Sequence, residues 1–320
     1  MASELLRLRV ERIRDEAALI RSFLLVDPQG ASLPGFSPGA HVDLHLANGL
    51  VRSYSLLNQP GSGKAYEIAV ARDAHTRGGS AFLFASVRTG DLIDVTPPRN
   101  HFALDESASH SVFIAGGIGI TPILSMVHRM SSLGANWSLY YAGRTRPQTA
   151  FLATLDALGD RVHLHMDDEQ NGLMDVKGIL VHHAQSGEGC HVYACGPGPM
   201  LDAFQAASAA WNAERVHLER FAAAAAVEVS TSTSFVVHLA RSGTSVTVPP
   251  GVSILDSLLE RGIELPYSCK EGTCGDCAVN VLDGVPEHRD VVLSKKRRAE
   301  NKVMMICCSR ARTETLTLDA

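Results

Sequence analysis

CKEGTCGDC, at residues 269–277, places three cysteines at the spacing C-x4-C-x2-C. The chain contains seven cysteines, an odd number, and charged residues interrupt its N-terminus throughout. We therefore expect a cytoplasmic protein in which clustered thiols serve metal binding or redox chemistry rather than disulfides. Three thiolates from one tight loop leave a fourth ligand to come from a distant segment, and Cys307 lies thirty positions beyond Cys277.

This arrangement has the spacing of plant-type [2Fe–2S] clusters. The predicted iron ligands are Cys269, Cys274, Cys277 and Cys307. We expect positive φ at Gly272 and Gly275, because the loop must bring its backbone close to the sulfur atoms. Zinc and a thioredoxin-like dithiol are the alternatives. Zinc sites usually combine two C-x2-C units or add histidines, and a redox dithiol opens a helix after a strand.

Cys308 is the rival fourth ligand. Neighbouring residues in an extended segment point in opposite directions, so only one member of this pair can bind the cluster. We assign that role to Cys307.

Residues 1–104 predict an antiparallel β-barrel, because short alternating segments are separated by Gly, Pro and Asn. The predicted strands are LLRLRVERI, HVDLHLANG, VRSYSLLN, YEIAVARD and DLIDVTPP, and one helical piece runs from Ser80 to about Val87. RSYSLLN (52–58) brings a cation, an aromatic ring and a hydroxyl together, which suits a flavin mononucleotide. TRGGSAFLF (76–84) places two glycines and a serine at a helix start, where bare amides bind anions. An ordinary barrel strand and an ordinary turn are the alternatives.

Residues 108–221 alternate strands and helices, which predicts an α/β domain with a parallel sheet and helices on both faces. FIAGGIGITPILSM (113–126) and YACGPGPM (193–200) are strand-to-helix turns, and open α/β sheets bind ligands at the carboxyl ends of their strands. We also predict a helix in RPQTAFLATLDALG (146–159). AAAAAVEVSTST (222–233) is small and polar, which indicates a linker. Residues 234–320 then predict two strands, a helix, the cysteine loop and a late strand pair.

The region around the cysteine loop resembles plant-type ferredoxins, which implies an α+β β-grasp domain. R-x-Y-S at 52–55, GG-x-G-x-T-P at 116–122 and C-G-P at 195–197 resemble motifs of the ferredoxin–NADP reductase superfamily. Within it, the order of flavin, nucleotide and ferredoxin domains resembles the phthalate dioxygenase reductase family, whose flavin is FMN. FAD remains an alternative, since an adenine half is not excluded. The FMN-binding residues implied are Arg52, Ser53, Tyr54, Ser55, Gly78, Gly79 and Ser80.

The same resemblance implies the nicotinamide site. Its residues would be Gly116, Gly117, Gly119, Thr121, Pro122, Arg144, Cys195 and Gly196. Ser55 and Cys195 would act as the catalytic residues by shaping the approach of nicotinamide to flavin. Phe221, in HLERF, would lie against the flavin, the alternative being an ordinary core aromatic. We favour NADH over NADPH, although Arg144 and Arg146 could also suit a 2′-phosphate.

These modules form a chain from a two-electron donor through a flavin to a one-electron carrier. The family resemblance implies a reductase component that passes electrons from NADH via FMN and a [2Fe–2S] cluster to a separate Rieske-type oxygenase. The alternative is a stand-alone electron-transfer flavoprotein serving another acceptor, such as a cytochrome P450. The net charge of −5 and the absence of a long apolar run argue against nucleic acid and membrane partners, and we expect a monomer. SKKRRAEN (294–301) is either a docking patch or a solvated helix start.

Overall fold

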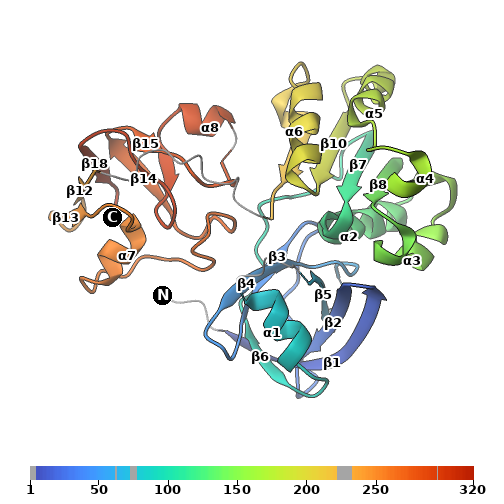
Figure 1. Ribbon diagram of the computed structural model, residues 1–320, viewed down its shortest axis with the longest axis horizontal. Helices are drawn as coiled ribbons and strands as arrows, with labels where there is room; N and C mark the ends of the chain where they lie inside the picture. Colours follow the sequence, from blue (N-terminus) through green and yellow to red (C-terminus); the bar gives the residue numbers. More distant parts are fainter. Residues whose placement is uncertain (1–4, 62, 73–77, 222–232, 294) are drawn as a thin grey trace. The chain divides into compact units, whose positions relative to one another are not determined.

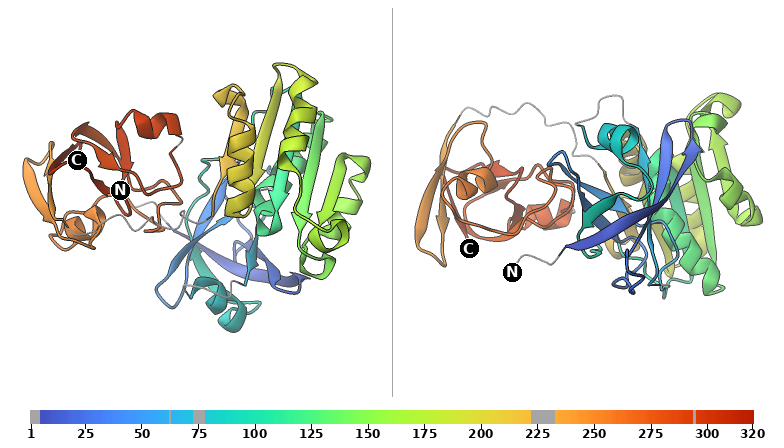
Figure 2. Two further views of the ribbon diagram at one scale, coloured as in Figure 1. Left: turned by 45° about the horizontal axis from the view of Figure 1, so that its top comes forward. Right: turned by 90° about the horizontal axis from the view of Figure 1, so that it is seen from below.

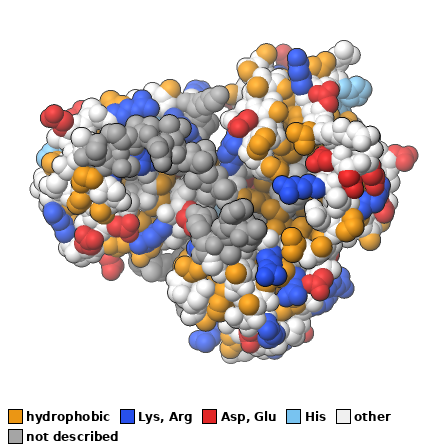
Figure 3. Space-filling view, viewed as in Figure 1, with side chains coloured by type: hydrophobic (Ala, Val, Ile, Leu, Met, Phe, Trp, Pro, Cys, Tyr) orange, Lys and Arg blue, Asp and Glu red, His pale blue; other side chains and the backbone are white. Residues whose placement is uncertain are grey.

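The computed structural model describes residues 5–61, 63–72, 78–221, 233–293 and 295–320 (Figure 1). They fall into two compact units that divide between Glu219 and Arg220. The predicted linker, apart from Thr233, lies outside the described residues. On the face drawn in Figure 3, acidic and basic side chains are scattered among apolar ones. Among the described residues, no helix has the length and apolar character needed to cross a membrane.

The first part of unit 1 is an antiparallel sheet in the order β4-β3-β6-β1-β2-β5. Its strands are β1 (Leu6–Ala17), β2 (Ile20–Val26), β3 (His41–His45), β4 (Val51–Ser55), β5 (Tyr66–Ala71) and β6 (Leu92–Val95). A bridge between Leu56 and Ile68 joins the two edges and closes the predicted barrel. The helix α1 (Gly79–Ser86) lies where the sequence predicted it.

β2 was not predicted. The connection between β1 and β2 is the dipeptide Ala18-Leu19, which contains none of the Gly, Pro or Asn residues that usually mark a turn. The two strands therefore pair as a hairpin whose turn no typical turn residue marks in the sequence.

The second part of unit 1 is a fully parallel sheet in the order β11-β10-β7-β8-β9. Its strands are β7 (His110–Gly116), β8 (Trp137–Gly143), β9 (Val162–Met166), β10 (Cys190–Cys195) and β11 (Val216–Glu219). The chain moves outward from β7 to one edge and then returns to β10 on the other side of β7. The strand order therefore reverses between β7 and β10, which is where such sheets bind ligands.

Helices cover both faces of this sheet, as predicted (Figures 1 and 2). They are α2 (Ile120–Ser132) and α3 (Leu152–Asp156) on one face, and α5 (Val176–His183) and α6 (Gly198–Ala207) on the other. Alternating residues of β7 pack into the two layers: Phe113 joins the core around α2, and Ile114 joins the core around α5 and α6. The short helix α4 (Asp167–Gln170) follows β9.

The single helix predicted over 146–159 is wrong. The segment forms a 3-10 turn at Arg146–Gln148 and then the five-residue helix α3. Phe151 interrupts them with a left-handed backbone (φ 63°), and its side chain is buried in the core around α2. Tertiary packing of this ring overrides the helical pattern that the sequence suggested.

The barrel and the parallel sheet share one hydrophobic core. Ile20, Leu57 and Phe102 from the barrel side pack in the same cluster as Met126 and Met130 of α2. The Ser125 hydroxyl of α2 also donates to the Asn58 carbonyl at 3.1 Å. This shared core explains why the two predicted domains form one compact unit.

Unit 2 is a mixed sheet in the order β13-β12-β18-β14-β16. Its strands are β12 (Phe235–Leu239), β13 (Thr244–Val248), β14 (Ala278–Asp283), β16 (Val303–Met305) and β18 (Thr315–Leu318). The helix α7 (Ile254–Leu259) packs three side chains into its core, and the Ser253 hydroxyl caps the helix. A second sheet pairs β15 (Pro286–Glu287) with β17 (Arg310–Ala311), and α8 (Lys295–Ala299) lies before β16. The α+β ferredoxin-type fold agrees with the prediction.

Candidate functional site

The four predicted cluster cysteines are buried and in mutual contact. Cys269, Cys274 and Cys277 come from the loop between α7 and β14, and Cys307 follows β16. The Cys269 sulfur lies within interaction range of the thiols of Cys274 and Cys307, and Cys307 is also within range of Cys277. No group of three or more His, Cys, Asp or Glu side chains in the described ranges is arranged around a single ion. The cluster assignment therefore rests on these sulfur contacts.

The loop backbone has the conformation expected from its glycines. Gly272 (φ 72°) and Gly275 (φ 85°) are both left-handed. Backbone amides point at sulfur: the N–H of Glu271 donates to Cys269 Sγ at 3.3 Å, and that of Asp276 donates to Cys274. Amide donors of this kind favour thiolates, which are the form that binds iron.

Cys307 and Cys308 lie in a turn, not in an extended segment. The argument from strand alternation therefore does not apply to them. The choice of the fourth ligand rests on their contacts instead. Cys307 meets the sulfurs of Cys269 and Cys277 as well as its neighbour Cys308, whose own Sγ lies 3.8 Å from the Met305 carbonyl and is partly exposed. These contacts favour Cys307 as the fourth ligand.

In the barrel, Arg52 of β4 lies against the start of α1. A β-carbon built on Gly79 would stand 2.6 Å from Arg52 Cγ and 2.8 Å from its Nε. Gly78, with φ 92°, turns the chain into the helix. The Arg52 side chain thus occupies the space that Gly79 leaves open because it has no side chain. It lies beside helix amides that can bind phosphate. Thr76 and Arg77 of the predicted phosphate loop lie outside the described residues.

Ser53 and Ser55 lie on the other face of β4. Ser53 stands opposite Asp43 of β3, and its hydroxyl donates to the Asp43 carboxylate at 2.5 Å. Asp43 has no exposed surface and also pairs with the Arg99 guanidinium. This buried network was missed by the sequence analysis, although Asp43 interrupts the apolar pattern of its strand. Ser55 is 5% exposed.

The two predicted nucleotide turns meet at the switch point of the parallel sheet. A β-carbon on Gly119 would lie 2.3 Å from the Cys195 carbonyl oxygen and 2.6 Å from the Gly196 nitrogen. A β-carbon on Gly116 would lie 2.7 Å from Pro197 Cδ. α2 begins at Ile120, with Thr121 and Pro122 in its first turn. The glycines therefore permit close backbone packing at the edge where a dinucleotide would bind.

Glu219 is a half-buried acid with an enclosed carboxyl oxygen that the sequence analysis missed. It pairs with Cys195 across β10 and β11, and its Oε2 has no hydrogen-bond partner. Burial raises the pKa of Glu219 to about 8 and the pKa of the Cys195 thiol well above its usual value. Both groups are therefore protonated at neutral pH. The sequence HLERF is typical of an exposed strand end. Only the pairing of β11 with β10 places the Glu219 carboxyl beside Cys195.

Two further predicted site residues, Arg144 and Phe221, lie at the surface. Arg144 follows β8 and is exposed, whereas the neighbouring Arg146 forms a bidentate ion pair with Glu169 at 2.6 and 3.2 Å. Phe221 is 41% exposed, so the alternative of an ordinary core aromatic is wrong. Its ring is available to a ligand.

Two family models match the chain. Residues 113–206 match the oxidoreductase NAD-binding domain, and residues 237–312 match the 2Fe-2S iron-sulfur cluster binding domain. The chain is 50% identical to phenoxybenzoate dioxygenase subunit beta of Ectopseudomonas oleovorans over 312 residues, which cover 98% of this chain and 96% of that protein.

Several solved structures match nearly the whole chain. Phthalate dioxygenase reductase, described as a modular structure for electron transfer from pyridine nucleotides to [2Fe-2S], is 38% identical with a TM-score of 0.75 and covers 99% of this chain and 98% of its own. An intact type IV self-sufficient cytochrome P450 monooxygenase is 37% identical with a TM-score of 0.86. The match covers 99% of this chain but only 41% of that longer protein.

Proposed function

This chain belongs to the phthalate dioxygenase reductase family, and from that premise we propose that it is the reductase component of a multicomponent oxygenase. It passes electrons from NADH through FMN and a [2Fe–2S] cluster to a separate oxygenase protein. The proposed domains are 1–104 for FMN, 108–221 for NADH, a linker at 222–233 and 234–320 for the cluster. When bound, the flavin supplies the step from a two-electron donor to a one-electron carrier.

The contact among the thiols of Cys269, Cys274, Cys277 and Cys307 is the observation that carries the proposal. A nucleotide-binding domain alone would fit many oxidoreductases. A buried four-thiol group in the same chain adds a one-electron carrier, so the chain's output is an electron for another protein.

The residues of unit 1 position the reactants rather than form covalent bonds to them. Arg52 and the amides at Gly79 and Ser80 would hold the FMN phosphate. Ser55 would lie near flavin N5, and the protonated thiol of Cys195 would shape the nicotinamide pocket without acting as a nucleophile. Glu219 is kept neutral by burial. It therefore supplies no negative charge that would stabilise the positive nicotinamide ring of the oxidised coenzyme.

NADH is the proposed donor. The exposed residues Asp168 and Glu169 follow the end of β9, and Arg146 is already paired with Glu169. A 2′-phosphate placed near this segment would meet carboxylates and would have to compete for that arginine. Arg144 remains available for the pyrophosphate or a ribose.

The acceptor is proposed to be a Rieske-type oxygenase, with the reductase acting as a cytoplasmic monomer. The odd number of cysteines, seven, supports a reducing compartment, where disulfides are rare. The match to the self-sufficient P450 monooxygenase supports a second candidate acceptor, a cytochrome P450, because an equivalent three-domain module there is joined to a P450 in one chain.

An anaerobic titration of the purified protein with NADH tests the proposal. The flavin and iron–sulfur absorbance bands should both bleach, and the flavin released afterwards should be FMN. A protein without iron–sulfur absorbance, or one whose cluster NADH leaves oxidised, contradicts it. Purified Rieske oxygenases and P450s, offered as acceptors to the reduced protein, then separate the two candidates.

A further inference from the structure

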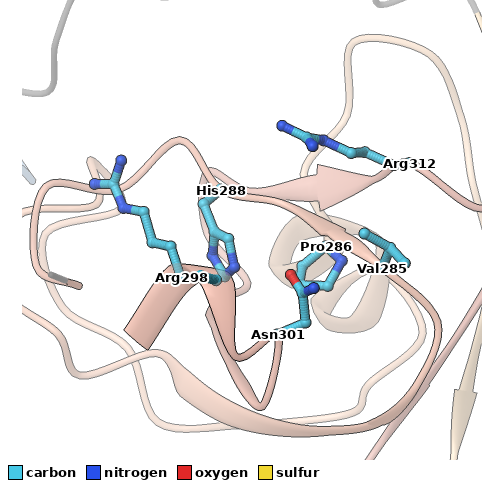
Figure 4. Close-up of a pocket in the computed structure, with 7 residues that line it drawn as sticks. Val285, Pro286, His288, Arg298, Asn301 and Arg312 are labelled. Carbon is cyan, nitrogen blue, oxygen red and sulfur yellow. The ribbon is translucent and has the colours of Figure 1, made fainter. Parts of the chain in front are cut away.

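A pocket of about 320 Å³ opens in the ferredoxin domain (Figure 4). Its lining residues are Val285, Pro286, His288, Arg298, Ala299, Asn301 and Arg312. In Figure 4 the His288 ring stands between Arg298 on one side and Asn301 and Pro286 on the other, and Arg312 extends above them. Two arginines and a histidine stand around this space, so the pocket is suited to an anion.

Several of these donors are not used within the chain. The side chain of His288 is 8% exposed, and neither of its ring nitrogens has a hydrogen-bond partner. Its closest acid is Asp290, whose Oδ1 lies 3.7 Å from His288 Nδ1 without a hydrogen-bond partner, whereas Oδ2 accepts from two backbone amides. The Arg298 Nε is buried without a partner, and the exposed Arg312 guanidinium forms no ion pair with the described residues. Unsatisfied buried donors are costly, which points to an external acceptor.

Two acids lie near the pocket, and each faces a basic side chain. Glu287 forms an ion pair with Arg289 at 3.0 Å, and the Asp290 carboxylate lies 3.8 Å from the Arg298 guanidinium. Arg312 therefore supplies a positive charge that no described acid pairs with, although the whole chain carries a net charge of −5.

The segment that follows the pocket residue His288 bonds to the cysteine loop and to the chain after Cys307. The Val291 amide donates to the Gly272 carbonyl at 3.0 Å, and the Arg289 amide donates to the hydroxyl of Ser309 at 3.2 Å. Gly272 lies between two predicted cluster ligands, and Ser309 lies two residues after the fourth. A group held in this pocket is therefore close to the cluster.

We propose that this pocket is the docking site for the electron-accepting protein and that it binds an acidic side chain, Asp or Glu, on that protein's surface. The proposal rests on the proposed function, since it requires an acceptor of electrons from the cluster. A carboxylate suits the pocket because His288, Asn301 and Arg312 can donate to its two oxygens, and the methylene stem can rest on Val285 and Pro286. The apolar floor favours a side chain over a fully hydrated small anion.

The test uses full-length protein whose cluster has been reduced with dithionite, so its outcome does not depend on NADH or flavin. Two one-electron acceptors serve as probes: the acidic haem domain of cytochrome b5 and the basic cytochrome c. Arg312→Gln should slow reduction of the acidic probe about three- to tenfold at low ionic strength, and Arg312→Glu should slow it further. Neither change should slow reduction of the basic probe. His288→Gln should act in the same direction as Arg312→Gln.

Arg261→Gln is the matched control. Arg261 donates to Ser245 of β13, at the opposite edge of the sheet from β16 and α8, so this variant removes the same charge elsewhere in the domain. The proposal is overturned if Arg261→Gln and Arg312→Gln slow the acidic probe equally, or if wild-type protein reduces only the basic probe. It is also overturned if inorganic phosphate binds in the pocket at constant ionic strength while the pocket variants leave the rates of acceptor reduction unchanged. A cluster that dithionite reduces but NADH does not would instead contradict the proposed function.

Discussion

Gly119 packs directly against the backbone of Cys195, and a β-carbon on Gly119 would stand 2.3 Å from the carbonyl oxygen of Cys195. This contact joins the turn after β7 to the turn after β10, at the point where the strand order reverses. The two motifs lie far apart in the sequence and form one edge of the proposed nicotinamide site.

Gly119→Ala should therefore damage both stability and coenzyme binding. The backbone of Cys195 cannot move as a flexible side chain would, so we expect a loss of about 1–3 kcal/mol in the free energy of unfolding. We also expect a higher KM for NADH in ferricyanide reduction. Urea unfolding and steady-state kinetics measure the two effects. Gly172→Ala, at a site with open space around it, should change neither. A normal KM in Gly119→Ala would remove this turn from the site.

Gly79→Ala should weaken flavin retention with little loss of stability. The new methyl group would displace Arg52, whose side chain can move, and the proposed phosphate ligand would then be lost. Arg52→Ala should have the same effect. Flavin content after gel filtration, compared with the thermal midpoint of the apoprotein, separates retention from folding. Gly35→Ala serves as the control, since a β-carbon there meets nothing within 4 Å. Full flavin content in both Gly79→Ala and Arg52→Ala contradicts the phosphate assignment.

Glu219 should make the protein less stable as the pH rises. Its pKa is about 8 in the folded chain and about 4.5 in the unfolded chain. Between these values the folded state binds more protons, so the free energy of unfolding falls with increasing pH. The limiting loss is about 5 kcal/mol, since each pKa unit corresponds to about 1.4 kcal/mol.

Glu219→Gln should remove this dependence, so its stability relative to wild type should rise between pH 5 and 8. Urea unfolding across that range measures the difference. Glu214→Gln, at an exposed position before β11, should follow the wild-type profile. Parallel profiles for Glu219→Gln and wild type would show that the carboxylate ionises normally.

The sequence analysis predicted those parts of the candidate site whose chemistry depends on local spacing. The cysteine positions and the glycine turns follow from short motifs, and the positive φ of Gly272 and Gly275 is confirmed. Residues that act through long-range pairing were missed. Asp43 meets Arg99 only because β3 and the segment after β6 are neighbours, and Glu219 meets Cys195 only because β11 pairs with β10.

Tertiary packing also explains the errors in secondary structure. Phe151 leaves the helical conformation to bury its ring, and the β1–β2 turn at Ala18-Leu19 is fixed by strand pairing rather than by turn residues. Neither effect has a signal in a short window of sequence.

Cys307 and Cys308 provide the sharpest test of the cluster, because they are adjacent and chemically identical. The Cys307 sulfur contacts the thiols of Cys269 and Cys277, whereas the Cys308 sulfur contacts Cys307 and the Met305 carbonyl. Cys307→Ser should abolish or strongly shift the iron–sulfur absorbance and the low-temperature EPR signal of the reduced protein. Cys308→Ser should retain both. Reduction of a dye through the flavin should survive in both variants, which shows that unit 1 remains folded.

Cys274→Ser should behave as Cys307→Ser, because its thiol belongs to the same set of contacts. Iron and sulfide analysis of the three purified variants gives the occupancy directly. The ligand assignment is wrong if Cys308→Ser loses the cluster while Cys307→Ser keeps it. The same result would place the cluster on the Gly272 side of the loop, where a β-carbon on Gly272 would lie 2.5 Å from Cys308 Sγ.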